Sequence, residues 1–193
     1  ILSSEPRPVP PDVAPEELAR GIAQIGIDRL PWTKAQRQLR DRVQFLRSVE
    51  PETWPDLSDE SLAATVCDWL APFLTGKTRL DEISPQDLDL ALDTLLPWDL
   101  KRRLDSEAPT RFVAPTGQSH TIRYDGPDAP ALHIRVQELF GLDEHPTVAG
   151  GKLPLTLHLL SPAHRPIQIT RDLPGFWRGS WAAVKAEMEG RYP

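Results

Sequence analysis

The residues best suited to binding chemistry gather near the end of this 193-residue chain. Cationic, imidazole and indole side chains follow one another there within about two dozen positions: His158, His164, Arg165, Arg171, Trp177 and Arg178. Arginine attracts a phosphate backbone, and aromatic rings stack on unpaired bases. This composition is typical of a surface that holds single-stranded nucleic acid. The candidate contacts are His158, His164, Arg165, Arg171 and Arg178.

Two of these residues also have a purely structural interpretation. Trp177 begins an apolar stripe at helical spacing that continues to Met188, which favours packing in the core. Arg171 stands beside Asp172, and a surface ion pair between them would contribute little to stability. The sequence leaves both alternatives open.

Other chemistries find little support in the residues. The glycines of segment 149–152 lack phosphate-loop spacing and precede a strand pattern, which argues against nucleotide binding. Ser161 has no flanking glycines of a nucleophile elbow, so a hydrolytic triad with His158 and Asp172 is not expected. No metal site is expected, because no two histidines lie three or four residues apart on a predicted helix. The five histidines are His120, His133, His145, His158 and His164.

The composition is that of a globular protein with an uneven charge. The net charge is −6, with 39% hydrophobic and 26% charged residues, which argues against a strongly basic nucleic-acid domain but allows a local basic patch. Residues 1–106 hold 13 basic and 19 acidic side chains, whereas residues 107–193 hold nine of each. The net negative charge therefore lies wholly in the first half. The spacing of apolar residues also changes between the two halves.

The cellular compartment of the protein can be predicted from features that the sequence lacks. No run of about 18 apolar residues occurs, so no transmembrane helix is expected. The N-terminal residues do not form a signal peptide, and the single cysteine, Cys67, suits a reducing compartment. We expect a cytoplasmic protein, and the opening without methionine indicates a fragment of a longer one.

The first half has the pattern of helices. Helical spacing predicts helices over 16–27, over about 17 residues from Trp32 with Pro31 in the first turn, and over 59–74. Ser84 and Pro85 form a start signal for the next helix, and Pro97 opens the last. The helix from Trp32 carries a basic face that is either solvated or a stripe for phosphates or an acidic partner: Lys34, Arg37, Arg40, Arg42 and Arg47.

The second half has the pattern of strands with a closing helix. Segments 110–114 and 119–124 predict a hairpin, and apolar residues alternate with polar ones over 132–137 and 153–159. A partner strand follows over 167–170. Asp172 is the expected cap of one final helix that lies on the sheet, with an apolar stripe of Trp177, Trp181, Val184 and Met188.

These patterns predict an α+β protein in three parts. Residues 1–15, rich in proline, are expected to be an extended linker. Residues 16–106 form a helical subregion, and residues 107–193 form a small, mostly antiparallel sheet with a packed C-terminal helix. From the residues alone, the sequence describes an accessory domain and no catalyst.

Several long motifs carry a resemblance to a known family. The longest is LPLTLHLLSPAHRPIQITRDLPGFWRGSWAAVKAEMEGRYP, and the shorter ones are LPWTKAQRQLRDRVQFLR, WPDLSDESL, DWLAPFL, LLPWDLKRRLD, APTRFVAPTGQ and VQELFGL. Together, and in this order, they resemble the C-terminal region of the bacterial HrpB-type ATP-dependent helicases, which are DEAH-box RNA helicases. The resemblance covers nearly the whole chain.

The resemblance implies a role without catalysis in this segment. The ATPase motifs of such helicases, with ATP and Mg²⁺, lie in two RecA-like domains upstream, so no cofactor is expected here. The resemblance implies an accessory domain that assists RNA binding by the motor, with single-stranded RNA and the RecA-like domains as partners and no membrane. The alternative is a structural or protein-docking module that packs on the motor or recruits another protein.

Overall fold

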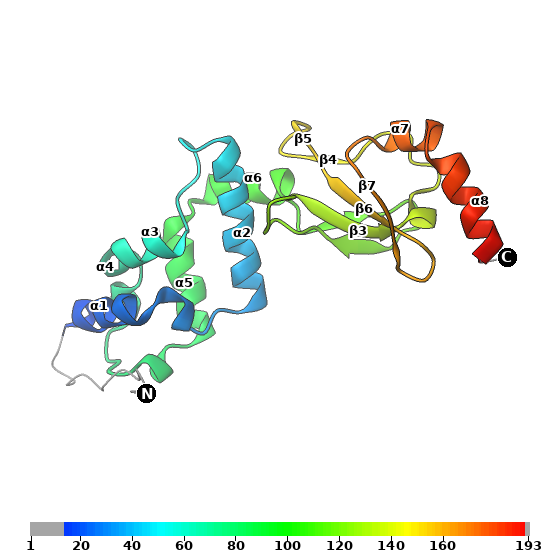
Figure 1. Ribbon diagram of the computed structural model, residues 1–193. Helices are drawn as coiled ribbons and strands as arrows, with labels where there is room; N and C mark the ends of the chain where they lie inside the picture. Colours follow the sequence, from blue (N-terminus) through cyan, green and yellow to red (C-terminus); the bar gives the residue numbers. More distant parts are fainter. Residues whose placement is uncertain (1–13, 192–193) are drawn as a thin grey trace. The chain divides into compact units, whose positions relative to one another are not determined.

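The computed structural model describes residues 14–191, and contacts divide it into two compact units (Figure 1). The helical unit extends up to Arg102, and the sheet unit begins at Arg103. The linker expected over 1–15 lies outside the described residues up to position 13, and the first helix already includes Pro15.

The helical unit consists of short helices in sequence. They are α1 (Pro15–Ile25), η1 (Ile27–Arg29), α2 (Lys34–Val49), α3 (Asp59–Ala64), α4 (Val66–Trp69), η2 (Ala71–Phe73), η3 (Leu80–Glu82), α5 (Pro85–Leu95) and α6 (Trp98–Glu107), which runs on into the sheet unit. The core of this unit buries three tryptophans, Trp32, Trp54 and Trp69, together with leucines at the predicted helical spacing.

Side-chain caps mark where α2 and α5 begin. The Thr33 hydroxyl accepts a hydrogen bond from the Gln36 N–H, and the Gln36 side chain accepts one from the Thr33 N–H, a capping box. Pro31 therefore precedes the cap, and the prediction that it stands in the first turn is wrong. Ser84 caps α5 in the same way with Asp87, and Pro85 occupies the first turn as predicted.

The single helix predicted over 59–74 is divided into α3, α4 and η2. The chain leaves helical geometry at Thr65, where φ is −108° and ψ is 16°, and the Thr65 hydroxyl donates to the carbonyl of Ser61. Such a bond to the carbonyl four residues earlier bends a helix. Pro72 then has no N–H to continue the ladder, so only a tight turn follows.

The sheet unit contains seven strands and two closing helices among its described residues. They are β1 (Arg111–Val113), β2 (Ser119–Thr121), β3 (Ala131–Arg135), η4 (Val136–Leu139), β4 (Thr147–Val148), β5 (Leu153–Pro154), β6 (Thr156–Leu160), β7 (Pro166–Thr170), α7 (Leu173–Arg178) and α8 (Trp181–Arg191). The predicted hairpin forms as β1 and β2. The α+β class is confirmed.

The central sheet of this unit has three strands in the order β3-β6-β7. β3 pairs with β6 in parallel, and β6 pairs with β7 antiparallel; the two small sheets, β1-β2 and β4-β5, are antiparallel. The strand pattern predicted over 153–159 is interrupted at Leu155, whose N–H donates to the carbonyl of Pro146. Pro154 has no N–H for a continuous ladder, so β5 and β6 join different sheets.

The closing helix is broken, contrary to the prediction of one helix. Asp172 caps α7 by accepting from the Gly175 N–H, as predicted, but the chain turns at Gly179, where φ is −106° and ψ is −93°. A Cβ at Gly179 would lie 3.1 Å from the Gly175 carbonyl, so glycine permits this close approach. α7 buries Leu173 and Phe176, whereas α8 has no buried residue among those described.

Candidate nucleic-acid interface

The central sheet has one face in the core and an opposite face that is exposed at His133 and Ile169. Leu132 and Ile134 of β3 and Leu157 and Leu159 of β6 are each at most 1% exposed. Because side chains alternate along a strand, the residues between them point to the opposite face. The period-two pattern of the sequence therefore places His158 on this opposite face.

Strand register lines up a row of three side chains across this face. His133 of β3 lies opposite His158 of β6, and His158 lies opposite Ile169 of β7. The two imidazoles stack with ring centroids 4.2 Å apart and an interplanar angle of 11°. Ile169 is 61% exposed although it is a large apolar residue. We call His133, His158 and Ile169 the sheet row.

Hydrogen bonding and charge give the two histidines different properties. His158 Nε2 donates to the Asp128 carboxylate at 2.6 Å, and this bond lowers the pKa of Asp128. Burial, and then electrostatic interaction with His158 and Arg123, lower the pKa of His133. His133 is therefore a neutral ring at neutral pH, suited to stacking, while the neighbouring His158 is fixed in orientation by Asp128.

One predicted arginine lies beside the row. The Nε of Arg171 donates to the Thr156 hydroxyl at 3.0 Å, which anchors an exposed guanidinium at the start of β6. The partner of Arg171 is therefore Thr156 and not the neighbouring Asp172, whose carboxylate caps α7. The remaining N–H groups of Arg171 are available to an anion beside the sheet row.

The other predicted contacts lie away from the row. His164 and Arg165 stand in the turn between β6 and β7, where His164 has φ of 62° and the Arg165 N–H donates to the Ser161 hydroxyl. Arg178 is exposed in the last turn of α7. The structure therefore brings His158 and Arg171 together, and places the remaining three elsewhere in the unit.

Trp177 takes part in packing. Its Nε1 donates to the carbonyl of Leu142 at 3.0 Å, and its ring is half-buried. It contacts a cluster of aromatic rings at centroid distances between 5.3 and 5.9 Å: Phe140, Phe176 and Trp181. The structural interpretation of Trp177 is the one its contacts favour.

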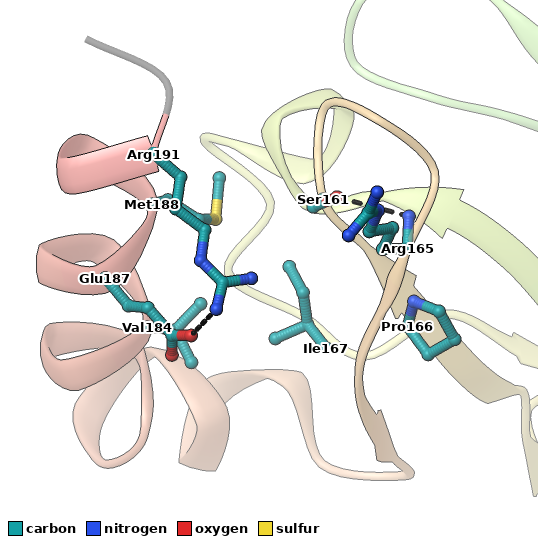
Figure 2. A pocket seen from close by; sticks show the side chains of 8 residues that line it. All are labelled: Ser161, Arg165, Pro166, Ile167, Val184, Glu187, Met188 and Arg191. Carbon is teal, nitrogen blue, oxygen red and sulfur yellow. Dashed lines mark hydrogen bonds and ion pairs between the residues drawn. The ribbon is translucent and has the colours of Figure 1, made fainter.

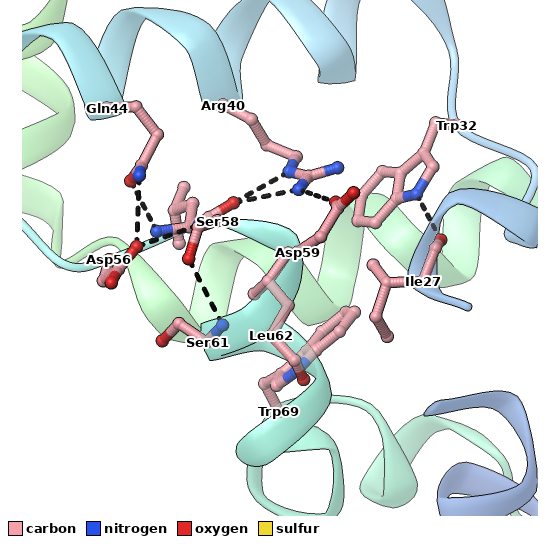
Figure 3. A network of polar contacts seen from close by, with 11 residues as sticks. Ile27, Trp32, Arg40, Gln44, Asp56, Ser58, Asp59, Ser61, Leu62 and Trp69 are labelled. Carbon is pink, nitrogen blue, oxygen red and sulfur yellow. Dashed lines mark hydrogen bonds and ion pairs between the residues drawn. The ribbon is translucent and has the colours of Figure 1, made fainter. Parts of the chain in front are cut away.

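The basic face of α2 is largely occupied by structural bonds (Figure 3). Arg40 donates to the Leu57 carbonyl at 3.1 and 3.0 Å and to Asp59 at 2.6 Å. Arg47 donates to two backbone carbonyls of segment 51–54, and Arg42 is 6% exposed. Arg40 and Arg47 hold the connection to α3, and Arg42 is buried, so these three arginines do not form a continuous basic stripe on this helix.

Sequence reasoning missed His133, Ile169, Asp128 and Arg123. The sequence carried only part of the information needed to find them. The alternation of apolar and polar residues shows which side chains point away from the core, but it does not show which strands pair. β3 and β6 pair in parallel, and two small strands lie between them in the sequence. No short segment of the sequence therefore indicates their register.

Two other kinds of feature are absent from the part of the chain that the structure describes. Residues 14–191 contain no group of three or more His, Cys, Asp or Glu side chains that could hold a metal ion. Within the same residues, no helix has the length and apolar character that a membrane crossing requires.

Comparison with known proteins gives consistent matches. The family model described as ATP-dependent helicase C-terminal, HrpB_C, matches residues 69–193. The ATP-dependent RNA helicase HrpB of Escherichia coli is 45% identical over 179 residues, which are 92% of this chain and 22% of that protein. This chain thus spans less than a quarter of that relative.

Two crystal structures from the same organism share the fold. One, described as the DExH-box NTPase HrpB, has a TM-score of 0.83 at 43% identity over 94% of this chain and 23% of its own. The other, described as the DEAH/RHA helicase HrpB, has a TM-score of 0.76 at 43% identity over 94% of this chain and 24% of its own. Since the family model covers well over half of the residues, this chain belongs to the HrpB-type ATP-dependent helicase C-terminal family.

Proposed function

We propose that this chain is an accessory domain that helps a helicase motor hold single-stranded RNA, with the RNA lying on the sheet row. The motor would be the RecA-like domains of the same protein, which would bind ATP and Mg²⁺ in the cytoplasm. The proposal draws on the name of the Escherichia coli relative, an ATP-dependent RNA helicase, and on the partly exposed face of the central sheet.

The sheet row is the observation that carries the proposal. His133 is exposed and stacks on the half-buried His158, and the exposed Ile169 adds apolar surface on the next strand. Adjacent strands are about 4.8 Å apart, so the row spans roughly 10 Å. Stacking of a base on an exposed ring such as His133 contributes about 1–3 kcal/mol and tolerates any base sequence.

Charge around the row suits a polyanion that passes through. Arg171 offers unused donors at one end of β6, and Arg123 is exposed next to β3, bridged to Ala131. The second half of the sequence is neutral as a whole, so a few arginines act without a strong basic field. Binding of this kind guides an RNA strand without holding it at one position.

Fluorescence anisotropy with single-stranded RNA at about 50 to 200 mM salt tests the proposal. Arg171→Gln should weaken binding and lower the slope of log affinity against log salt by about 0.7, the contribution of one phosphate on a single strand. Arg20→Gln is the matched control, because Arg20 is exposed on α1.

His133→Ala provides a second arm with a different signature. It should weaken binding through lost stacking while the salt slope stays the same, because the ring is neutral. Absence of binding by the wild-type chain at about 50 mM salt contradicts the proposal.

Protein docking is the second candidate, and two exposed apolar residues of the helical unit favour it. Trp98 is 69% exposed on α6, where Arg102 lies 4.8 Å from its ring centroid, and Leu90 is 54% exposed on α5. An association with the RecA-like domains that resists salt and is lost in Trp98→Ser would support docking over RNA guidance.

A further inference from the structure

A hollow of about 250 Å³ lies between β7 and α8, apart from the sheet row (Figure 2). One wall is the turn that carries Arg165 and the first residues of β7, and the other is one face of α8. Ligand sites for whole drug-sized molecules begin at about 300 Å³, so this hollow suits a smaller unit.

The hollow has an apolar floor. Ile167 projects from β7, and Val184 and Met188 project from α8, one turn apart on the same helix face. The three are half-buried, which leaves apolar surface open between the two elements. Val184 and Met188 belong to the stripe that the sequence assigns to the core, yet here they line an opening.

Charged groups stand at the rim of the hollow. Arg191 Nη2 lies 3.3 Å from Glu187 Oε1, and both side chains are about two-thirds exposed. Opposite them, the backbone of Arg165 is fixed by reciprocal bonds with Ser161, while its side chain is exposed. Among the described residues, the Arg165 guanidinium has no carboxylate partner.

These groups define the chemistry of a ligand. Two guanidinium groups and one carboxylate leave a surplus of one positive charge, and a guanidinium fork matches the oxygens of a phosphate. An aliphatic floor beside such a pair accepts a flat or apolar group attached to the anion. A single nucleotide unit meets both conditions.

The location favours RNA over an acidic peptide as the source of that unit. β7 carries Ile169 of the sheet row and, at its other end, Pro166 at the hollow. Three residues of a strand span about 10 Å. Ile167 in the hollow and Ile169 in the row are two residues apart on β7 and share a face, so an RNA strand that leaves the row reaches the hollow after a short path along β7.

We infer that this hollow is a second contact for the RNA, in which Arg165 and Arg191 hold one phosphate and Ile167, Val184 and Met188 contact the attached nucleoside. The inference rests on the proposed function. Glu187 competes with the phosphate for Arg191, so it keeps the contact weak and reversible.

Four variants of α8, titrated with an oligouridylate by fluorescence anisotropy, test this inference. Arg191→Gln should weaken binding several-fold and reduce the salt slope by about 0.7, whereas Lys185→Gln makes the same change of charge on the helix away from the hollow and should have little effect. Glu187→Gln should tighten binding, because it releases Arg191, whereas Glu189→Gln should not.

The two matched pairs of variants distinguish a specific phosphate contact from a general effect of net charge on RNA binding. Equal effects within each pair, or no effect in any of the four, overturn the inference. If Arg171→Gln weakens binding while all four α8 variants behave as wild type, the proposed function stands and the second contact falls. Binding of a glutamate-rich peptide that depends on Arg191, without an effect of Arg191 on RNA, assigns the hollow to a protein partner and also overturns it.

Discussion

Glu138 offers a demanding test of how the sheet unit is held together. Its side chain is 4% exposed on η4, with Oε1 2.8 Å from His120 Nε2 and Oε2 3.3 Å from Arg135 Nε. It therefore joins the β1-β2 hairpin to the segment that follows β3. Glu138→Gln keeps the shape but removes the charge and presents an amide N–H₂ to one of two donors.

The expected loss follows from the two contacts. A hydrogen bond to a charged group contributes about 1.5–3 kcal/mol, but His120 and Arg135 are 25% and 32% exposed and can turn to water. We therefore expect Glu138→Gln to lower the free energy of unfolding by about 2 kcal/mol, or Tm by roughly 10 °C for a unit of this size.

The pH dependence identifies the cause. Burial raises the pKa of Glu138, but the hydrogen bonds and charges of His120 and Arg135 outweigh it, so the pKa is lowered. A lowered folded pKa contributes stability that is present above the ordinary value, about 4.3, and is lost as pH falls through the folded value. The difference between wild type and Glu138→Gln should therefore shrink below about pH 4.

Thermal unfolding followed by circular dichroism measures this difference across pH. Glu144→Gln is the control, because Glu144 is an exposed carboxylate of the same unit. A loss that stays constant down to about pH 3, or an equal loss in Glu144→Gln, would refute the assignment to a buried charged network.

Further predictions concern the helical unit and are measured by urea or thermal unfolding. Ser84→Ala removes a capping box and should cost about 1 kcal/mol; an unchanged midpoint would mean that Pro85 alone sets the helix start. The hydrogen bond from the Ser84 backbone lowers the pKa of Asp87, so Asp87→Asn should destabilise at neutral pH and match wild type once the medium is acid enough to protonate Asp87. Trp69→Phe keeps an aromatic ring but leaves the Leu62 carbonyl without its indole donor, and about 1–2 kcal/mol should be lost; full stability would show that water replaces the bond.

Local features of the fold could be predicted where one short segment decides them. Ser84 with Pro85 marks a helix start, and the alternation around Ile134 marks a half-buried strand, because each signal lies within a few residues. The breaks at Thr65 and Gly179 were missed, since both lie inside apolar spacing that continues across them.

The candidate site could be predicted only in part for the same reason. His158 and Arg171 were found by residue type, but the stack on His133 depends on parallel pairing between distant strands. Arg40 and Arg47 were indistinguishable from solvated arginines in the sequence, because their partners are backbone carbonyls that only the fold brings near.

Side-chain methyl NMR of Ile169 during titration with an oligouridylate tests the central claim most directly. If bases stack on the sheet row, ring currents should shift the Ile169 δ1 methyl signal, while Ile134, buried on the opposite face, should stay in place. Saturation with RNA that leaves the Ile169 signal unmoved would contradict the account, because the strand would then bind elsewhere or not at all.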